Sequence, residues 1–306
     1  MKKRLLEGLI TPIMTPFNRD ENQSINYEET KHLVDYVIEN GVDGIFVLGS
    51  NGEFTVVNKK EKIEFTKKVI EFVDERVPVY AGPGCCSTYE TVQTAREMEK
   101  LGVSALSVIS PYFVKLTDSE LYEHFKTVAE SVNVPVILYN IPRMTGNPIS
   151  KEVFRKLATV KNIAGIKDSS RDLDNLKNYI EVAKAHDLKV LVGSDGIIME
   201  GYKMGASGAI AGMSNVIPKV MANLFKALYE GNDEAASKYQ EEVNYIRAVN
   251  KKATMPVVLK RSLELGQIAQ VGPARKPAKE SSPELDEEIK AMLRHYEIEQ
   301  SRKLNE

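Results

Sequence analysis

The chain has 306 residues, enough for one large domain or two ordinary ones with a sizeable buried core. Apolar residues make up 42% and charged residues 27%, a balance that is typical of folded globular proteins and argues against disorder. With 41 basic and 43 acidic residues, the net charge is -2, which argues against a nucleic-acid or membrane-surface partner because both require a basic patch.

The cysteines and the N-terminus indicate where the protein works. Cys85 and Cys86 are adjacent, too close for an ordinary structural disulfide and too few for a zinc site. No apolar run approaches the ~20 residues of a membrane span. The basic residues 2–4 are not followed by the long apolar stretch of a signal peptide. We therefore expect a cytoplasmic protein.

Short runs rich in apolar and β-branched residues recur along the chain, and each ends in small or polar residues. Several are apolar throughout, which is typical of strands buried on both faces of a parallel sheet. The predicted strands lie near residues 9–14, 44–49, 77–82, 104–110, 134–140, 163–168, 189–194 and 207–212.

The segments between these runs have helical spacing. Residues 27–40 carry an apolar stripe, and Asp118 is expected to cap a helix over residues 118–131. A glycine at a helix C-terminus supplies the left-handed residue that turns the chain back. Three helices are expected to end in this way, at Gly41, Gly102 and Gly205.

The order of these elements predicts the fold. Most strand starts are ~25–35 residues apart, the length of one βα unit, and eight units in ~220 residues indicate a (β/α)8 TIM barrel. The main rival, a doubly wound sheet, usually carries a glycine fingerprint after its first strand, where this chain has residues 15–17, Thr-Pro-Phe. We predict a barrel over residues 1–230 and a C-terminal helical region over residues 231–306.

Lys167 is the most unusual of the polar residues that end the predicted strands, where a barrel enzyme carries its active site. Burying an ammonium is costly unless it is paired or deprotonated, and a free amine can attack a carbonyl. A structural ion pair with Asp168 or Glu53 is the alternative. Tyr139 ends the preceding strand, so it can lie beside Lys167 and relay a proton.

Residues 49–53, Gly-Ser-Asn-Gly-Glu, predict a turn after the second strand. Its exposed backbone N–H groups could hold a carboxylate, and Ser50 could hydrogen-bond to a tyrosine hydroxyl. The four histidines show no HExxH or HxH spacing, so we predict no metal site. The chain also has neither a GxSxG elbow nor a Walker A sequence.

Taken together, residues 49–54, 139–142 and 165–168 resemble the dihydrodipicolinate synthase / N-acetylneuraminate lyase family of class I pyruvate aldolases. Their sequences are Gly-Ser-Asn-Gly-Glu-Phe, Tyr-Asn-Ile-Pro and Gly-Ile-Lys-Asp. The resemblance extends from about residue 6 to the C-terminus, and Tyr-Asn-x-Pro followed by Gly-x-Lys at this spacing is its most specific part.

The resemblance implies a role for each matching residue. Lys167 would form a Schiff base with the keto carbon of pyruvate, and Tyr139 would shuttle the proton. Ser50 would contact that tyrosine, and the backbone amides of Ser50 and Asn51 would hold the pyruvate carboxylate. The carbonyl of Ile210 and the region of Gly193 would line the same pocket. No metal or other cofactor is implied, and the expected assembly is a homotetramer.

Several positions depart from the synthase branch of the family. Met144 stands where the synthase has the arginine that binds the carboxylate of aspartate semialdehyde, and the nearby Arg143 points in a different direction. Phe113 replaces a tyrosine that relays protons across a subunit interface. Ser169 replaces a small apolar residue, whereas sugar-acid lyases tend to have a hydroxyl there.

The sequence therefore predicts a lyase that reversibly splits a 2-keto-3-deoxy sugar acid, of the 2-keto-3-deoxygluconate type, into pyruvate and an aldehyde. The alternatives are an N-acetylneuraminate lyase, a dihydrodipicolinate synthase that condenses pyruvate with aspartate semialdehyde, and a keto-acid-binding barrel without turnover. Retention of both Lys167 and Tyr139 argues against the last.

Overall fold

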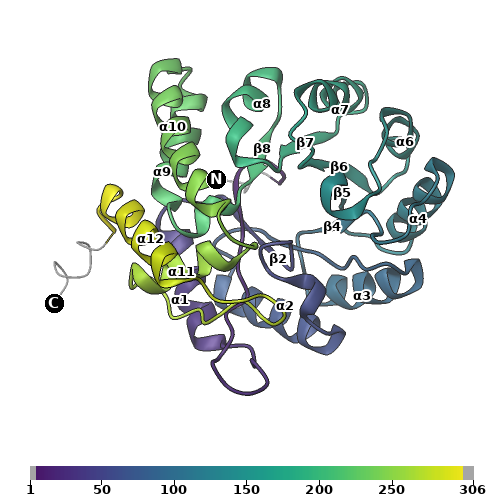
Figure 1. Ribbon diagram of the computed structural model, residues 1–306. Helices are drawn as coiled ribbons and strands as arrows, with labels where there is room; N and C mark the ends of the chain where they lie inside the picture. Colours follow the sequence, from purple (N-terminus) through teal and green to yellow (C-terminus); the bar gives the residue numbers. More distant parts are fainter. Residues whose placement is uncertain (1–4, 299–306) are drawn as a thin grey trace. The chain divides into compact units, whose positions relative to one another are not determined.

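The computed structural model describes residues 5–298, and within them eight strands close into a parallel barrel in sequence order (Figure 1). The TIM barrel is therefore confirmed, and the doubly wound alternative is wrong. The strands are β1 (Gly8–Pro12), β2 (Gly44–Val47), β3 (Val79–Ala81), β4 (Ala105–Ile109), β5 (Val136–Asn140), β6 (Ile163–Asp168), β7 (Lys189–Val192) and β8 (Gly208–Ile210).

The barrel interior is filled by side chains from alternate positions of the strands, as the period-2 geometry of a strand requires. One buried cluster in the interior consists of the tyrosine of β3 and of apolar side chains, of which Leu6 lies just before β1. Its members are Leu6, Ile10, Phe46, Tyr80, Ala105, Ile137, Leu191 and Ile210.

Helices follow the strands and continue past the barrel. Three short 3-10 turns, η1 (Phe54–Val56), η2 (Asp195–Ile197) and η3 (Gly212–Asn215), lie among them in the described chain. The helices are α1 (Tyr27–Glu39), α2 (Lys59–Val73), α3 (Thr88–Lys100), α4 (Asp118–Glu130), α5 (Pro142–Thr145), α6 (Lys151–Leu157), α7 (Leu173–Ala185), α8 (Ile198–Met204), α9 (Pro218–Tyr229), α10 (Asp233–Asn250), α11 (Val257–Leu265) and α12 (Pro283–His295).

Side-chain caps fix where several helices begin. At α4 the cap is Thr117 rather than the predicted Asp118, because Thr117 and Glu120 form a reciprocal capping box. Asp118 lies in the first turn instead, where a carboxylate is favoured by the helix dipole, and it accepts a hydrogen bond from Ser150. The predicted glycines do follow their helices, with φ of 91° at Gly41, 89° at Gly102 and 114° at Gly205.

The described chain divides into two compact units. The first comprises residues 5–10, 43–46 and 75–211, and in it the helices α3, α4, α6, α7 and α8 lie outside the strands β4 to β8 (Figure 1). The second comprises residues 11–42, 47–74 and 212–298. In the second unit α10 packs against α9, and α12 packs against α10 and α11. The predicted domain boundary at residue 230 stays a prediction. The last residues of the predicted C-terminal helical region, 299–306, lie outside the described range.

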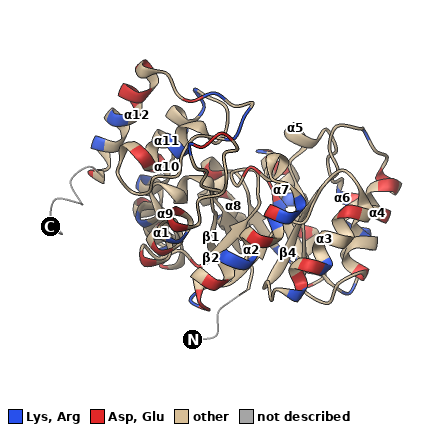
Figure 2. Ribbon diagram, turned by 90° about the horizontal axis from the view of Figure 1, so that it is seen from below, with Lys and Arg blue, Asp and Glu red and all other residues tan. Residues whose placement is uncertain are grey.

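The surface carries both signs of charge. Figure 2 shows Lys and Arg interspersed with Asp and Glu along the helices, for example on α12. This is the usual pattern of a solvated helix face. In residues 5–298, none of the helices combines the length and the apolar character that a bilayer crossing requires.

Candidate active site

The pairing of β5 with β6 determines which side chains meet at the end of these strands. Tyr139 lies opposite Lys167, and Asn140 lies opposite Asp168. Parallel neighbours in register point to the same face of a sheet, and successive residues point to opposite faces. Tyr139 and Lys167 therefore share the inner face of the barrel, continuing the side on which Ile137 lies.

Lys167 is enclosed by aromatic rings. Its side chain is only 4% exposed, and its Nζ lies 3.9 Å from the ring centre of Tyr139 and 5.2 Å from that of Phe46. An ammonium over the face of a ring is attracted by the ring quadrupole, which partly offsets the cost of burying the charge. The structure thus confirms that Tyr139 lies beside Lys167. Phe46 was not singled out from the sequence, although it lies in the strand predicted near residues 44–49, which is a usable signal.

The two carboxylates considered as ion-pair partners of Lys167 have other partners. Asp168 accepts hydrogen bonds from Asn140 Nδ2 at 2.8 Å and from Ser170 Oγ at 2.7 Å. Burial raises the pKa of Asp168, and these hydrogen bonds oppose that rise. Glu53 forms an ion pair with Lys260, with 2.6 Å between Oε1 and Nζ. Both carboxylates are therefore bound by groups other than Lys167, which argues against a structural ion pair at Lys167.

Gly193, which follows β7, leaves room for the lysine side chain. A Cβ at this position would overlap Ser169 Oγ and lie 2.9 Å from Lys167 Cε. The Ser169 hydroxyl donates to the Gly193 carbonyl at 3.1 Å, and the Gly193 N–H donates to the Asp168 carbonyl at 2.7 Å. The structure therefore brings Ser169 and Gly193 together with Lys167. Ile210 is buried in the barrel interior, and the role of its carbonyl stays a prediction.

Ser50 and Asn51 lie in the second unit, in a tight turn after β2. The Glu53 N–H donates to the Ser50 carbonyl at 3.2 Å, and Thr15 Oγ1 donates to the Gly52 carbonyl at 2.7 Å. A Cβ at Gly52 would lie 3.1 Å from the backbone nitrogen of Leu48, a tight contact, so the turn lies close against the preceding chain. The roles of Ser50 and Asn51 toward a carboxylate stay predictions.

Two of the three positions that depart from the synthase pattern, Phe113 and Met144, are on the surface, whereas Ser169 is buried. Phe113 is 95% exposed, and Met144, in α5, is 51% exposed beside the exposed Arg143. Asn147 orders the loop that carries Phe113, because its Nδ2 donates to the carbonyl oxygens of Pro111 and Val114, both at 2.8 Å.

Another buried lysine, Lys260, was missed by the sequence reasoning. Besides its pair with Glu53, its Nζ donates to the Pro273 carbonyl at 3.1 Å and lies 4.2 Å from the ring centre of Phe17. Burial lowers its pKa to about 8, against the opposing effect of Glu53. A lysine directly after three apolar residues of a predicted helix, Val-Val-Leu at 257–259, is a signal that could have found it. These contacts anchor its amine, so Lys167 remains the candidate nucleophile.

The site can support imine chemistry from its own side chains. A primary amine lies over a tyrosine ring at the rim of an apolar barrel, with a serine hydroxyl next to the glycine that makes room for it. Within residues 5–298, no group of three or more His, Cys, Asp or Glu side chains is placed to hold a metal ion.

The chain matches the dihydrodipicolinate synthetase family over residues 5–296. It is 34% identical over 289 residues to a DapA-like lyase of Halobacterium salinarum, covering 94% of this chain and 92% of that protein. It is 32% identical over 297 residues to the 4-hydroxy-tetrahydrodipicolinate synthase of Acetivibrio thermocellus, covering 97% and 99%.

Solved structures agree with these relatives. Dihydrodipicolinate synthase from Thermotoga maritima superimposes with a TM-score of 0.92 at 30% identity, covering 96% of this chain and 100% of that one. YagE, a prophage protein of the same family from Escherichia coli K12 solved in complex with pyruvate, gives a TM-score of 0.91 at 31% identity with the same coverage. The chain therefore belongs to the dihydrodipicolinate synthetase family and is a class I pyruvate-dependent lyase, of a kind that works through a lysine Schiff base and uses no further cofactor.

Proposed function

We propose that the protein reversibly cleaves a 2-keto-3-deoxy sugar acid, of the 2-keto-3-deoxygluconate type, into pyruvate and an aldehyde. The observation that carries the proposal is the amine of Lys167 against the ring of Tyr139, with the Ser169 hydroxyl beside the same lysine. The family supplies the pyruvate-dependent chemistry. The residues of this chain supply the choice of the second substrate.

In the cleavage direction, Lys167 Nζ attacks the keto carbon of the sugar acid and water leaves to give a protonated imine. Tyr139 accepts the proton of the hydroxyl on C4. The C3–C4 bond then breaks, its electron pair moves toward the imine nitrogen to form an enamine, and the aldehyde departs. Protonation of the enamine at C3 and hydrolysis release pyruvate and restore the amine. The backbone amides of Ser50 and Asn51 hold the carboxylate throughout.

Met144 and Ser169 support a hydroxylated substrate. A semialdehyde with its own amino-acid carboxylate calls for a cation, and arginine pairs with carboxylates most strongly, but this position is Met144. A sugar acid presents several hydroxyls, for which Ser169 is a donor and acceptor. The alternatives are an N-acetylneuraminate lyase and dihydrodipicolinate synthase, and several relatives carry the synthase name. A binding barrel without turnover is the least favoured.

The first prediction concerns the nucleophile. With pyruvate present, borohydride should trap one pyruvate-derived adduct, which intact mass and peptide mapping should assign to Lys167. Lys167→Arg should abolish trapping while circular dichroism stays unchanged, because a guanidinium remains protonated and is a poor nucleophile. An adduct on a different lysine would contradict the proposal.

The second prediction concerns Tyr139→Phe, which removes the hydroxyl and keeps the ring over Lys167. We expect kcat to fall by roughly 10²–10⁴, the usual contribution of a positioned acid–base group. Pyruvate should still be trapped on Lys167. Turnover at the wild-type rate would show that another group or water moves the proton.

The third prediction separates the candidate substrates. By kcat/KM, the wild type should prefer hydroxylated aldehydes such as glyceraldehyde to aspartate semialdehyde as partners for pyruvate. Ser169→Ala should weaken the hydroxylated aldehydes selectively, by the ~1–3 kcal/mol that an unpaired buried polar group costs, and leave imine formation intact. If aspartate semialdehyde is the best substrate, the synthase alternative holds and Arg143→Ala becomes the next variant to measure.

The fourth prediction concerns assembly. We infer that the protein is cytoplasmic and forms a homotetramer. The exposed apolar side chains of Phe113 and Val114, which a partner subunit would cover, support the assembly. Sedimentation velocity should show a tetramer, and Phe113→Ser with Val114→Ser should weaken it. A fully active monomer of the wild type would contradict this inference.

A further inference from the structure

Glu53 ends the turn that carries Ser50 and Asn51, and it has an unusual backbone. Its φ is 56°, in the left-handed region that a residue with a Cβ enters only at a cost. Its side chain is buried, and its N–H closes the turn on the Ser50 carbonyl at 3.2 Å. Contacts of the buried Glu53 side chain can offset the cost of this conformation.

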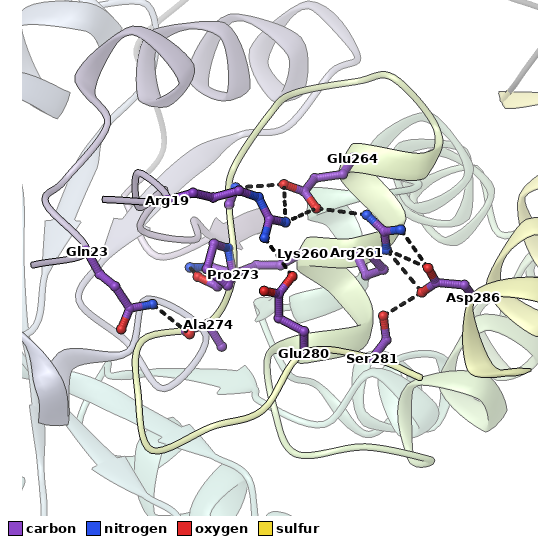
Figure 3. Close-up of polar contacts among 11 residues, drawn as sticks. Arg19, Gln23, Lys260, Arg261, Glu264, Pro273, Ala274, Glu280, Ser281 and Asp286 are labelled. Carbon is purple, nitrogen blue, oxygen red and sulfur yellow. Dashed lines mark hydrogen bonds and ion pairs between the residues drawn. The ribbon is translucent and has the colours of Figure 1, made fainter. Parts of the chain in front are cut away.

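Lys260 of α11 supplies one such contact. Its ammonium is buried and lies 2.6 Å from Glu53 Oε1, and its remaining neighbours include the Pro273 carbonyl and the Phe17 ring. Figure 3 shows the Lys260 side chain reaching Pro273, while Arg261 of the same helix turns to Asp286 of α12. The ammonium of Lys260 is thus paired with the carboxylate of the turn, whereas the guanidinium of Arg261 is paired elsewhere.

Arg275 supplies the second contact, from the loop after α11. Its backbone N–H donates to Glu53 Oε2 at 2.8 Å, so one carboxylate oxygen of Glu53 is ion-paired with Lys260 and the other accepts a hydrogen bond. Its guanidinium pairs with both oxygens of Glu61 at 2.8 and 2.9 Å and donates to the Val56 carbonyl at 2.8 Å. The loop is therefore fastened to the chain on both sides of η1.

We propose that Lys260 and Arg275 are positioning residues for substrate binding: by holding Glu53, they set the direction of the Ser50 and Asn51 backbone N–H groups that receive the substrate carboxylate. This inference rests on the proposed function of those amides. If Glu53 loses its partner, its peptide can relax toward ordinary φ values, and the preceding peptide planes rotate with it. The consequence falls on carboxylate recognition rather than on the amine of Lys167.

Two carbonyl compounds can distinguish carboxylate binding from imine formation, because both form an imine with an amine and only one of them carries a carboxylate. The readout is the concentration that gives half-maximal borohydride trapping on Lys167, with pyruvate and with acetone, which has no carboxylate. Glu53→Gln keeps the shape of the side chain and removes the charge, and Lys260→Met removes the ammonium. Each should raise the half-saturating pyruvate roughly tenfold or more, because one buried charge is left unpaired. The value for acetone should stay within about twofold.

Two further variants sharpen the test. The double variant of Glu53→Gln with Lys260→Met should bind pyruvate better than the sum of the single effects predicts, because no unpaired charge remains. Arg261→Met is the matched control, since it removes the neighbouring cation of α11, which pairs with Asp286 and Glu264 and not with Glu53, and it should leave both half-saturation values unchanged. If Lys260→Met fails to fold, Glu53→Gln decides alone.

Equal shifts for pyruvate and acetone, or no shift for either, would overturn the inference, because the cluster would then serve stability only. Absence of a Lys167 adduct in the wild type is a different result. It would remove the proposed function itself, so the two failures can be told apart.

Discussion

The in-register pairing of β5 with β6 is the constraint on which the rest of the site depends. It places Tyr139 and Lys167 opposite each other on the inner face, where an amine and a phenol can act on one carbonyl. A shift of either strand by one residue would turn that strand's own side chain, Tyr139 or Lys167, to the outside, because side chains alternate with a period of two. On the outer face, the hydrogen bond from Asn140 to Asp168 forms only in the observed register, so it favours the same arrangement.

The lysine also needs space and an environment that tolerates its charge. Gly193 provides the space, since any side chain there would collide with Lys167 and Ser169. The rings of Tyr139 and Phe46 provide the environment, because the lysine amine lies over the π-face of each ring. The Lys167 amine is held at the end of the barrel by packing against these rings. The Lys260 amine is held instead by an ion pair with the Glu53 carboxylate. This difference between two buried lysines supports the proposal that Lys167 is the nucleophile.

The sequence predicts the barrel well, because each strand is a local apolar run and each glycine after a helix has a local cause. It also predicts that Tyr139 lies beside Lys167, since polar residues that end neighbouring apolar runs stand out, and the catalytic roles of both stay predictions. It fails at Asp118, where the neighbouring threonine competes for the cap and wins through Glu120. It also misses the Lys260 cluster, because Glu53 and Arg275 are 222 positions apart and no local pattern joins them. In the proposed function, the choice of aldehyde would depend on Ser169 and Met144, single positions whose effect is a difference between two affinities.

The proposed roles of Lys167 in imine formation and of the turn at Ser50 and Asn51 in carboxylate binding can be tested together in a crystal of the protein soaked with pyruvate. We expect continuous electron density from Lys167 Nζ to the keto carbon of pyruvate, with the carboxylate facing the amides of Ser50 and Asn51. Density joined to Lys260, or pyruvate bound without a covalent link while the enzyme turns over, would contradict these roles.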